Sequence, residues 1–269
     1  MDGKHIKNTR GEMLLREHIM ELRKRLIISL IAIGFGGCIG YIWYGSGGGF
    51  LLPLGELLRG PYCSLPPDLR ANLSVSGECR LLATKPFDMF LLRFKVGMVA
   101  GVVISSPVWI FQIWAYVAPG LYKKEKKFTA IFLFISAILF SSGSVLGYFV
   151  LDKGLEFLLG VGREFQVAAI SGSDYYELVR NFVLLFGFSF EVPLIVIALN
   201  HFGILKYSTI SGKRRIIWFF IFFLGAIISP GQEVLSMLAL SLSVGFLLEI
   251  SFLYCMLNDR RKKLGTEAS

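Results

Sequence analysis

Three acidic side chains in this sequence stand out because each lies within or beside a long apolar stretch. Glu191 lies inside one, in the segment 186–193, whereas Glu21 and Glu125 stand next to basic runs. A charge near the middle of a bilayer costs roughly 2.5 kcal/mol or more, so such carboxylates are normally kept for a function. At a membrane boundary, partial desolvation strengthens a charge-assisted hydrogen bond to arginine. The chemistry that these acids offer is therefore ion pairing and hydrogen bonding.

Each of these acids has two interpretations. Glu191 is either a protonated or hydrogen-bonded staple between helices, or a polar spot in a concave face that meets a transported segment or a partner helix. Glu21 is spaced i,i+4 from Arg25, and Glu125 is flanked by lysines, so the residues alone favour ordinary surface ion pairs.

Enzyme chemistry has little support in the sequence. There is no Gly-x-Ser-x-Gly elbow, no His-Glu-x-x-His pair and no phosphate-binding glycine loop. The three histidines, His5, His18 and His201, are too scattered to ligate a haem or a zinc cluster. We therefore expect no enzyme, no metal and no cofactor.

The composition is that of an all-α integral membrane protein. Of 269 residues, 54% are apolar and 14% aromatic, and the mean hydropathy is +0.63, above the usual range for soluble domains. Apolar runs of about 20 residues predict membrane-spanning helices. The sequence predicts one polytopic domain, 1–269, with spans at 27–44, 96–117, 128–150, 182–200, 216–228 and 234–256. Six crossings place both termini on one side, and the fifth span is short.

The distribution of the +9 net charge predicts which side that is. Lys and Arg cluster before the first span and after the last, which by the positive-inside rule predicts cytoplasmic termini. Clustering in short segments also argues against a nucleic-acid partner. Residues 1–26 include a helical apolar pattern that predicts a cytoplasmic amphipathic helix, and 257–269 form a basic tail. A cleaved signal peptide is the competing interpretation of the N-terminus, but no convincing cleavage site follows the apolar run.

Two segments are predicted to be external. The first, from Gly45 to Lys85, is rich in Gly, Pro and Ser and is either an ordered cap or a flexible loop. It holds Cys63 and Cys79, which an oxidising compartment permits to form a disulfide, with free thiols as the alternative. The second, 151–177, predicts short helices along the outer surface. Three Gly-x-x-x-Gly motifs, at 36–40, 97–101 and 143–147, permit close helix approach, although a Gly-rich chain also produces them by chance.

Taken together, these segments resemble TatC, the multi-spanning receptor of the bacterial twin-arginine translocase. The resemblance covers most of the chain and rests on several ordered motifs: His18-x-x-Glu21-Leu22-Arg23-x-Arg25-Leu26, Thr84-x-Pro86-x-Asp88-x-Phe90 with Lys95, Pro107 to Glu125 with Gln112-x-Trp114 and Pro119-Gly120-Leu121-Tyr122, Phe186-Gly187-x-x-Phe190-Glu191-x-Pro193, and Lys213-Arg214-Arg215.

The resemblance implies a six-helix, glove-like fold with a concave face and cytoplasmic termini, in the bacterial inner membrane. It implies that arginines of Arg-Arg signal peptides bind Glu21 and Glu125 near Arg23 and Tyr116. Two guanidinium groups need two planar acceptors, and lysine cannot form the same bidentate fork. Gln112 and Glu191 are predicted to form an intramembrane polar site.

The resemblance also implies partners. These are TatB-like and TatA-like single-span proteins that meet the fifth and sixth helices, membrane lipid, folded cargo and further copies of the chain in a receptor complex. The expected partner-contact residues are Ser229, Gln232, Glu233 and Met237. Departures from the family pattern are Asp88 in place of Glu, the Ser229-Pro230-Gly231-Gln232-Glu233 turn, and Ser243 at a position often held by Pro.

Two functions follow as hypotheses. The first is a translocase subunit that recognises Arg-Arg signals and recruits single-span partners for export driven by the proton-motive force. The second is a proton-coupled small-solute secondary transporter with Glu191 as a proton relay. Inverted repeats and discontinuous helices in matching halves would favour the second, and the sequence shows neither.

Overall fold

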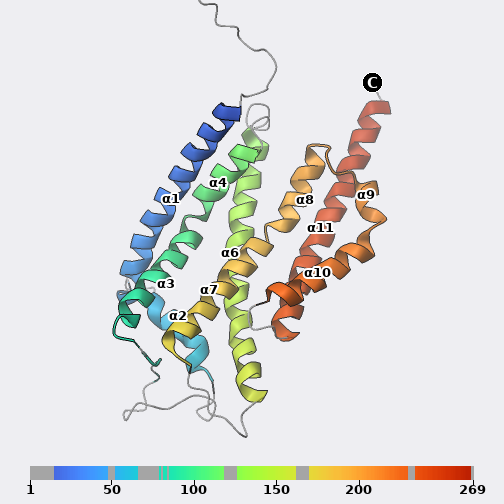
Figure 1. The fold of residues 1–269 in the computed structure, drawn as a ribbon. Helices are drawn as coiled ribbons and strands as arrows, with labels where there is room; N and C mark the ends of the chain where they lie inside the picture. Colours follow the sequence, from blue (N-terminus) through green and yellow to red (C-terminus); the bar gives the residue numbers. More distant parts are fainter. Residues whose placement is uncertain are drawn as a thin grey trace, which may run out of the picture.

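Long helices make up most of the structure (Figure 1). The computed structural model describes residues 15–47, 52–65, 79, 81–83, 85–117, 126–161, 170–229 and 234–267. The helices are α1 (Leu15–Gly45), α2 (Leu54–Cys63), α3 (Asp88–Ile104), α4 (Ser106–Val117), α6 (Lys126–Val161), α7 (Gly172–Ser189), α8 (Val192–His201), α9 (Tyr207–Ser211), α10 (Arg214–Ile228) and α11 (Val234–Glu267). The start of α1 and the end of α11 lie at the same end of the molecule (Figure 1).

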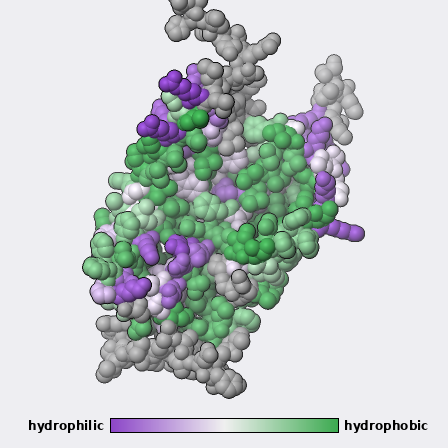
Figure 2. Space-filling view, in the orientation of Figure 1, coloured by the Kyte–Doolittle hydropathy of each residue, from purple (hydrophilic) through white to green (hydrophobic). Residues whose placement is uncertain are grey.

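The helices carry the apolar surface expected of a membrane protein. Among the described residues, four helical stretches are long and apolar enough to cross a bilayer, and the bent pair α3–α4 is a candidate for a fifth. Large apolar side chains are exposed over a broad band of the surface (Figure 2). Phe35 and Phe134 are among the most exposed large apolar residues. α10 has 15 residues and spans roughly 22 Å, less than a hydrocarbon core of about 30 Å. The sixth crossing therefore stays a prediction.

From Leu15 onward, the first two predicted segments form a single helix. α1 begins inside the predicted amphipathic helix of 1–26 and runs without interruption through the predicted span of 27–44. The segment contains no proline, and its Leu, Ile, Arg and Glu residues favour helix, so nothing ends it before Gly45-Ser46-Gly47. The predicted break at Gly45 is confirmed, and the helix predicted to lead into the first span is continuous with it. Its place at the membrane interface stays a prediction.

The second predicted span, 96–117, is not one straight helix. α3 begins earlier, at Asp88, whose carboxylate accepts a hydrogen bond from the Lys85 backbone N–H (2.9 Å). The helix then bends by 58° at Ser105. Pro107 lacks an N–H and is tolerated only in the first turn of a helix, so the chain restarts there as α4. The Trp109 indole N–H donates to the Val102 carbonyl oxygen (2.9 Å) at the bend.

Two other helices run beyond the predicted spans. α6 has 36 residues, about 54 Å, and continues to Val161, so the prediction of surface helices is wrong for 151–161. α11 continues past 256 to Glu267. Apolar runs mark the part of a helix that contacts lipid, and polar residues that continue the helix carry no apolar signal. The predicted span at 182–200 corresponds to α7 and α8, which are interrupted at Phe190 and Glu191.

Two of the glycine motifs bring α1 and α3 together. A Cβ added to Gly36 would lie 2.8 Å from the Gly101 carbonyl oxygen, and one added to Gly40 would lie 2.6 Å from that of Gly97. α1 and α3 pack along each other more extensively than any other helix pair in the described structure. The backbones therefore approach as closely as the small-residue motif predicts.

The described part of the first segment predicted to be external is an ordered cap, which we define as residues 52–65 with Cys79 and 81–83. The Tyr148 and Tyr175 hydroxyls donate to α2 backbone carbonyls, at 2.5 Å to Leu57 and 2.6 Å to Leu58. A disulfide joins Cys63 and Cys79, whose Cα atoms are 5.8 Å apart. The cap is thus attached to α6 and α7.

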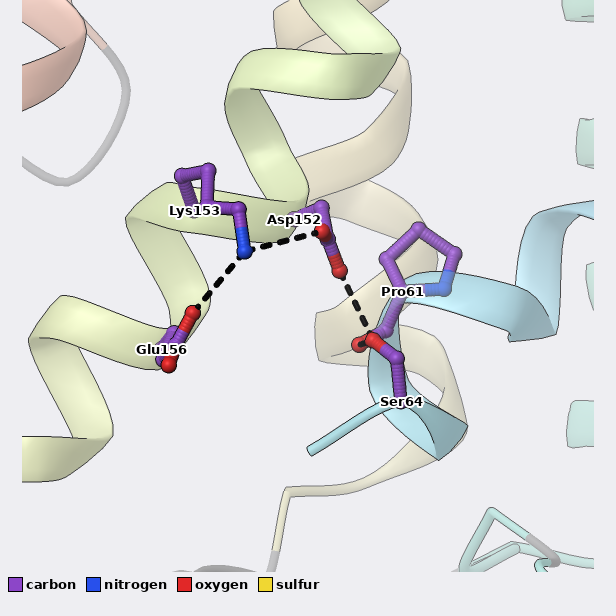
Figure 3. A network of polar contacts seen from close by, with 5 residues as sticks. All are labelled: Pro61, Ser64, Asp152, Lys153 and Glu156. Atoms are coloured by element: carbon purple, nitrogen blue, oxygen red, sulfur yellow. Dashed lines mark hydrogen bonds and ion pairs between the residues drawn. The ribbon is translucent and has the colours of Figure 1, made fainter. Parts of the chain in front are cut away.

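A polar network also ties the end of α2 to α6 (Figure 3). The Ser64 hydroxyl lies 2.7 Å from an Asp152 carboxylate oxygen and 2.9 Å from the Pro61 carbonyl oxygen, and its one proton serves one acceptor at a time. Lys153 contacts both Asp152 (3.7 Å) and Glu156 (3.1 Å). These contacts are exposed, so each adds little to the stability of the cap.

Candidate functional site

The end of the molecule where α1 begins holds a three-residue polar cluster. The Arg25 guanidinium donates from Nε (3.0 Å) and Nη2 (2.5 Å) to the same oxygen, Oε1, of Glu21. Its Nη1 lies 3.3 Å from Oε1 of Gln112 on α4. The Arg25 and Glu21 side chains are 23% and 25% exposed, so the pair is partly desolvated. The i,i+4 pair that the residues alone favoured for Glu21 is confirmed.

A second contact links the same two helices. The His18 imidazole stacks on the Tyr116 ring, with centroids 4.5 Å apart and an interplanar angle of 22°. Tyr116 thus lies next to α1 at His18, which is about one helical turn before Glu21. Arg23 is exposed on α1 and has no hydrogen-bond or ion-pair partner among the described residues. Glu125 lies outside the described residues, in the segment between α4 and α6.

Glu191 lies at the break between α7 and α8. Pro193 cannot donate a hydrogen bond to the preceding turn, so the helix stops and restarts around this residue. The Ser136 hydroxyl on α6 donates to Oε2 of Glu191 (2.5 Å). The other oxygen, Oε1, is buried without a partner in the described part of the chain. The contact fits the staple interpretation, and the second oxygen offers a vacant acceptor.

Glu191 and Gln112, predicted to belong to one intramembrane polar site, have different partners in the structure. Within the described ranges, Gln112 contacts Arg25, and Glu191 contacts Ser136. Gln112 lies within α4, which packs against α1, whereas Glu191 lies at the break between α7 and α8. Ser136 was missed because a serine in an apolar run gives no sign of its partner.

The predicted partner-contact residues lie around the start of α11. Ser229 is buried at the end of α10, and Met237 is half-buried on α11 near Gly225. Gln232 and Glu233 fall outside the described residues. Ser243, a departure from the family pattern, donates to the Ala239 carbonyl oxygen within α11 (2.7 Å).

Polar contacts tie α10 to α11 farther along. Glu249 accepts from the Trp218 indole N–H (3.0 Å) and contacts Arg214 (3.3 Å). The sequence favours a plain interfacial residue at Glu249 and gives no sign of this cluster. It also gives no sign of the role of the buried Asn200, which donates to Asp259 (3.0 Å) and so joins the end of α8 to α11. The partners are about 30 to 60 positions apart, so no local pattern reveals them.

Comparison with known proteins identifies the family. The model of the family described as Sec-independent protein translocase protein (TatC) matches residues 17–242. The chain belongs to the TatC family. A TatC of Corynebacterium kroppenstedtii is 43% identical over 95% of this chain and 64% of its own length. The chain thus spans less than two thirds of that relative. A TatC of Frankia casuarinae is 37% identical over 93% of this chain and 68% of its length.

Solved TatC structures agree with the described fold. A crystal structure of the twin-arginine translocase receptor TatC in detergent superposes with a TM-score of 0.71 and 29% identity, over 88% of this chain and 99% of that one. The chain is therefore a multi-pass membrane protein of a protein translocase and not an enzyme. Membership of this family removes the support for the small-solute transporter.

Proposed function

We propose that the chain recognises Arg-Arg signal peptides at the cytoplasmic face of a bacterial inner membrane. In this proposal Glu21 and Glu125 accept hydrogen bonds from the two signal arginines, and Arg23 and Tyr116 line the same site. The chain crosses the membrane six times, with both termini cytoplasmic. The likeness to crystal structures of a twin-arginine translocase receptor supports the proposal.

One observation carries the proposal: the Glu21 carboxylate already binds a guanidinium. Arg25 donates two hydrogen bonds to it in a partly desolvated position. A carboxylate that binds one guanidinium has the geometry and the charge to bind another. Four lysines around Glu125 repel a cationic peptide, but screening over about 8 to 10 Å leaves short contacts dominant.

The proposal extends to transport. We infer that TatB-like and TatA-like single-span helices contact the region of Ser229, Gln232, Glu233 and Met237, and that the vacant oxygen of Glu191 accepts a hydrogen bond from a partner or cargo segment. Gln112 belongs to the signal site in this proposal, because it contacts Arg25. Export is driven by the proton-motive force, in a complex that contains further copies of the chain and bound lipid.

Binding of a fluorescent Arg-Arg signal peptide to the full chain in lipid nanodiscs tests the recognition site. Replacing Glu21 or Glu125 by Gln removes a charged acceptor and no core volume. Loss of a charge-assisted hydrogen bond of about 1.5 to 3 kcal/mol lowers the affinity roughly tenfold to a hundredfold. A Lys-Lys peptide should lose less, since lysine cannot form the fork.

Glu17→Gln provides the matched control, because Glu17 is an exposed acid on the same helix, one turn before Glu21. It removes the same charge and should leave the affinity almost unchanged. If the double variant Glu21→Gln, Glu125→Gln bound the Arg-Arg peptide as tightly as the wild type, at normal membrane levels, the site would be refuted.

A further inference from the structure

Arg25 occupies one of the two carboxylate oxygens of Glu21, the acid that the proposed signal site needs. Its Nε and Nη2 both donate to Oε1 of Glu21, at 3.0 and 2.5 Å. Oε2 of Glu21 has no hydrogen-bond partner among the described residues. The chain therefore presents its own guanidinium to the acid that is proposed to bind a guanidinium from the signal.

We propose that Arg25 is an internal competitor for Glu21, which an arginine of the signal peptide displaces. This inference rests on the proposed function, because it concerns the same carboxylate. In the empty receptor Arg25 neutralises a partly desolvated acid that would otherwise lack a counter-charge. When the signal peptide binds, its arginine replaces Arg25 as the hydrogen-bond donor to Glu21. One guanidinium is thus exchanged for another.

The contact between Arg25 and Gln112 gives the displaced side chain a place to go. Nη1 is already within 3.3 Å of Gln112 Oε1, on α4. The guanidinium can therefore release Glu21 and keep a hydrogen bond to α4. Arg23, two residues earlier, is exposed without such contacts among the described residues, so it does not compete for the acid in the same way.

Competition has a signature that a direct binding role lacks. A competitor reduces the fraction of receptor whose acid is vacant, and the apparent affinity of every ligand falls by that same fraction. Removing Arg25 should therefore raise the affinity for an Arg-Arg peptide and for a Lys-Lys peptide by equal factors. If Arg25 instead organised the site for the signal, its removal would lower the affinity.

The variant Arg25→Met tests this, because it removes the guanidinium and keeps an unbranched apolar stem. We expect the affinity for both peptides to rise about threefold to tenfold. This range lies between the effect of losing an exposed i,i+4 ion pair and that of losing a hydrogen bond to a charged group. Arg25→Lys keeps the charge and loses the fork, and should give a smaller gain. If Arg25→Met does not fold, the gain with Arg25→Lys decides.

Lys24→Met is the matched control for charge. Lys24 is the neighbouring residue, exposed, without an ion-pair partner among the described residues, and its removal also makes a cationic peptide less repelled. Competition requires a larger gain from Arg25→Met than from Lys24→Met. Equal gains, or a loss of affinity in Arg25→Met, would overturn the proposal.

The double variant Glu21→Gln, Arg25→Met separates this inference from the proposed function. If Arg25 acts through Glu21, its removal gives no gain beyond that of Lys24→Met once the acid is absent. If Glu21→Gln alone weakens binding but Arg25→Met does not strengthen it, the competitor is refuted and the signal site stands. If Glu21→Gln changes nothing, both proposals fail.

Discussion

The close approach of α1 and α3 leads to a stability prediction with a well-defined geometry. In the variant Gly40→Ala, the added Cβ would lie 2.6 Å from the Gly97 carbonyl oxygen, 2.8 Å from the Ala100 Cβ and 3.1 Å from the Gly97 Cα. Ordinary contacts between carbon atoms are about 3.5 to 4.0 Å, so the helices must separate by roughly 1 Å. Overpacking of this kind costs about 1 to 3 kcal/mol.

Gly34→Ala supplies the control, because it lies on the same helix and its added Cβ meets nothing within 4 Å. Both variants gain up to about 1 kcal/mol from the higher helix propensity of alanine. Their difference therefore isolates the steric effect, and Gly40→Ala should be less stable than Gly34→Ala by about 1 to 3 kcal/mol.

The assay is unfolding in mixed micelles by increasing sodium dodecyl sulfate, followed by circular dichroism. Each variant is compared with the wild type at the same protein concentration and in the same detergent. If Gly40→Ala proved as stable as Gly34→Ala, the two helices would not be in backbone contact at this level, and the packing argument would be wrong.

Three further predictions follow from contacts elsewhere. The disulfide between Cys63 and Cys79 closes a loop of 16 positions and should stabilise the cap by about 3 kcal/mol; mass mapping of non-reduced membranes that found both thiols free would contradict it. Glu191→Gln should export cargo better than Glu191→Leu, because Gln keeps an acceptor for the Ser136 hydroxyl; normal export and partner crosslinks in Glu191→Leu would argue against any functional role. Glu249→Leu should speed hydrogen exchange in α10 more than Glu249→Gln, which keeps an acceptor, and equal rates would show that the cluster does not hold α10.

The sequence predicted the helical membrane fold because that fold depends on one strong, local signal. Apolar runs placed most spans, and Gly45 correctly ended α1. The errors concern features that apolarity does not report. α6 and α11 continue as helices beyond their apolar parts, and the bend at Ser105 depends on a proline that stands two residues later, inside an apolar run. Helices in a membrane are limited by caps and prolines rather than by hydropathy.

The candidate site was predictable only in part, for a different reason. Glu21 was found because its type and position are unusual, and its i,i+4 partner Arg25 follows from helix geometry. The contacts of Arg25 with Gln112 and of Glu191 with Ser136 join residues far apart in the chain, and neither the type nor the position of Gln112 or Ser136 identifies its partner. Side-chain pairing between helices needs the rotation of each helix about its axis, which a short polar motif does not determine.

The two interpretations of Glu21, a local ion pair and a binding site for a signal arginine, are therefore compatible. Without a bound signal peptide, a partly desolvated carboxylate that lacked a counter-charge would destabilise the fold. An arginine one helical turn away removes that destabilisation, because its guanidinium donates two hydrogen bonds to the acid. The consequence is a weaker apparent affinity for the ligand, by the fraction of receptors in which the pair is closed. A surface ion pair is ordinarily a poor sign of function. Here Arg25 binds Glu21 through a guanidinium, the same group that the proposed ligand carries. In the proposal, the pair is therefore the state of the site before a signal peptide binds.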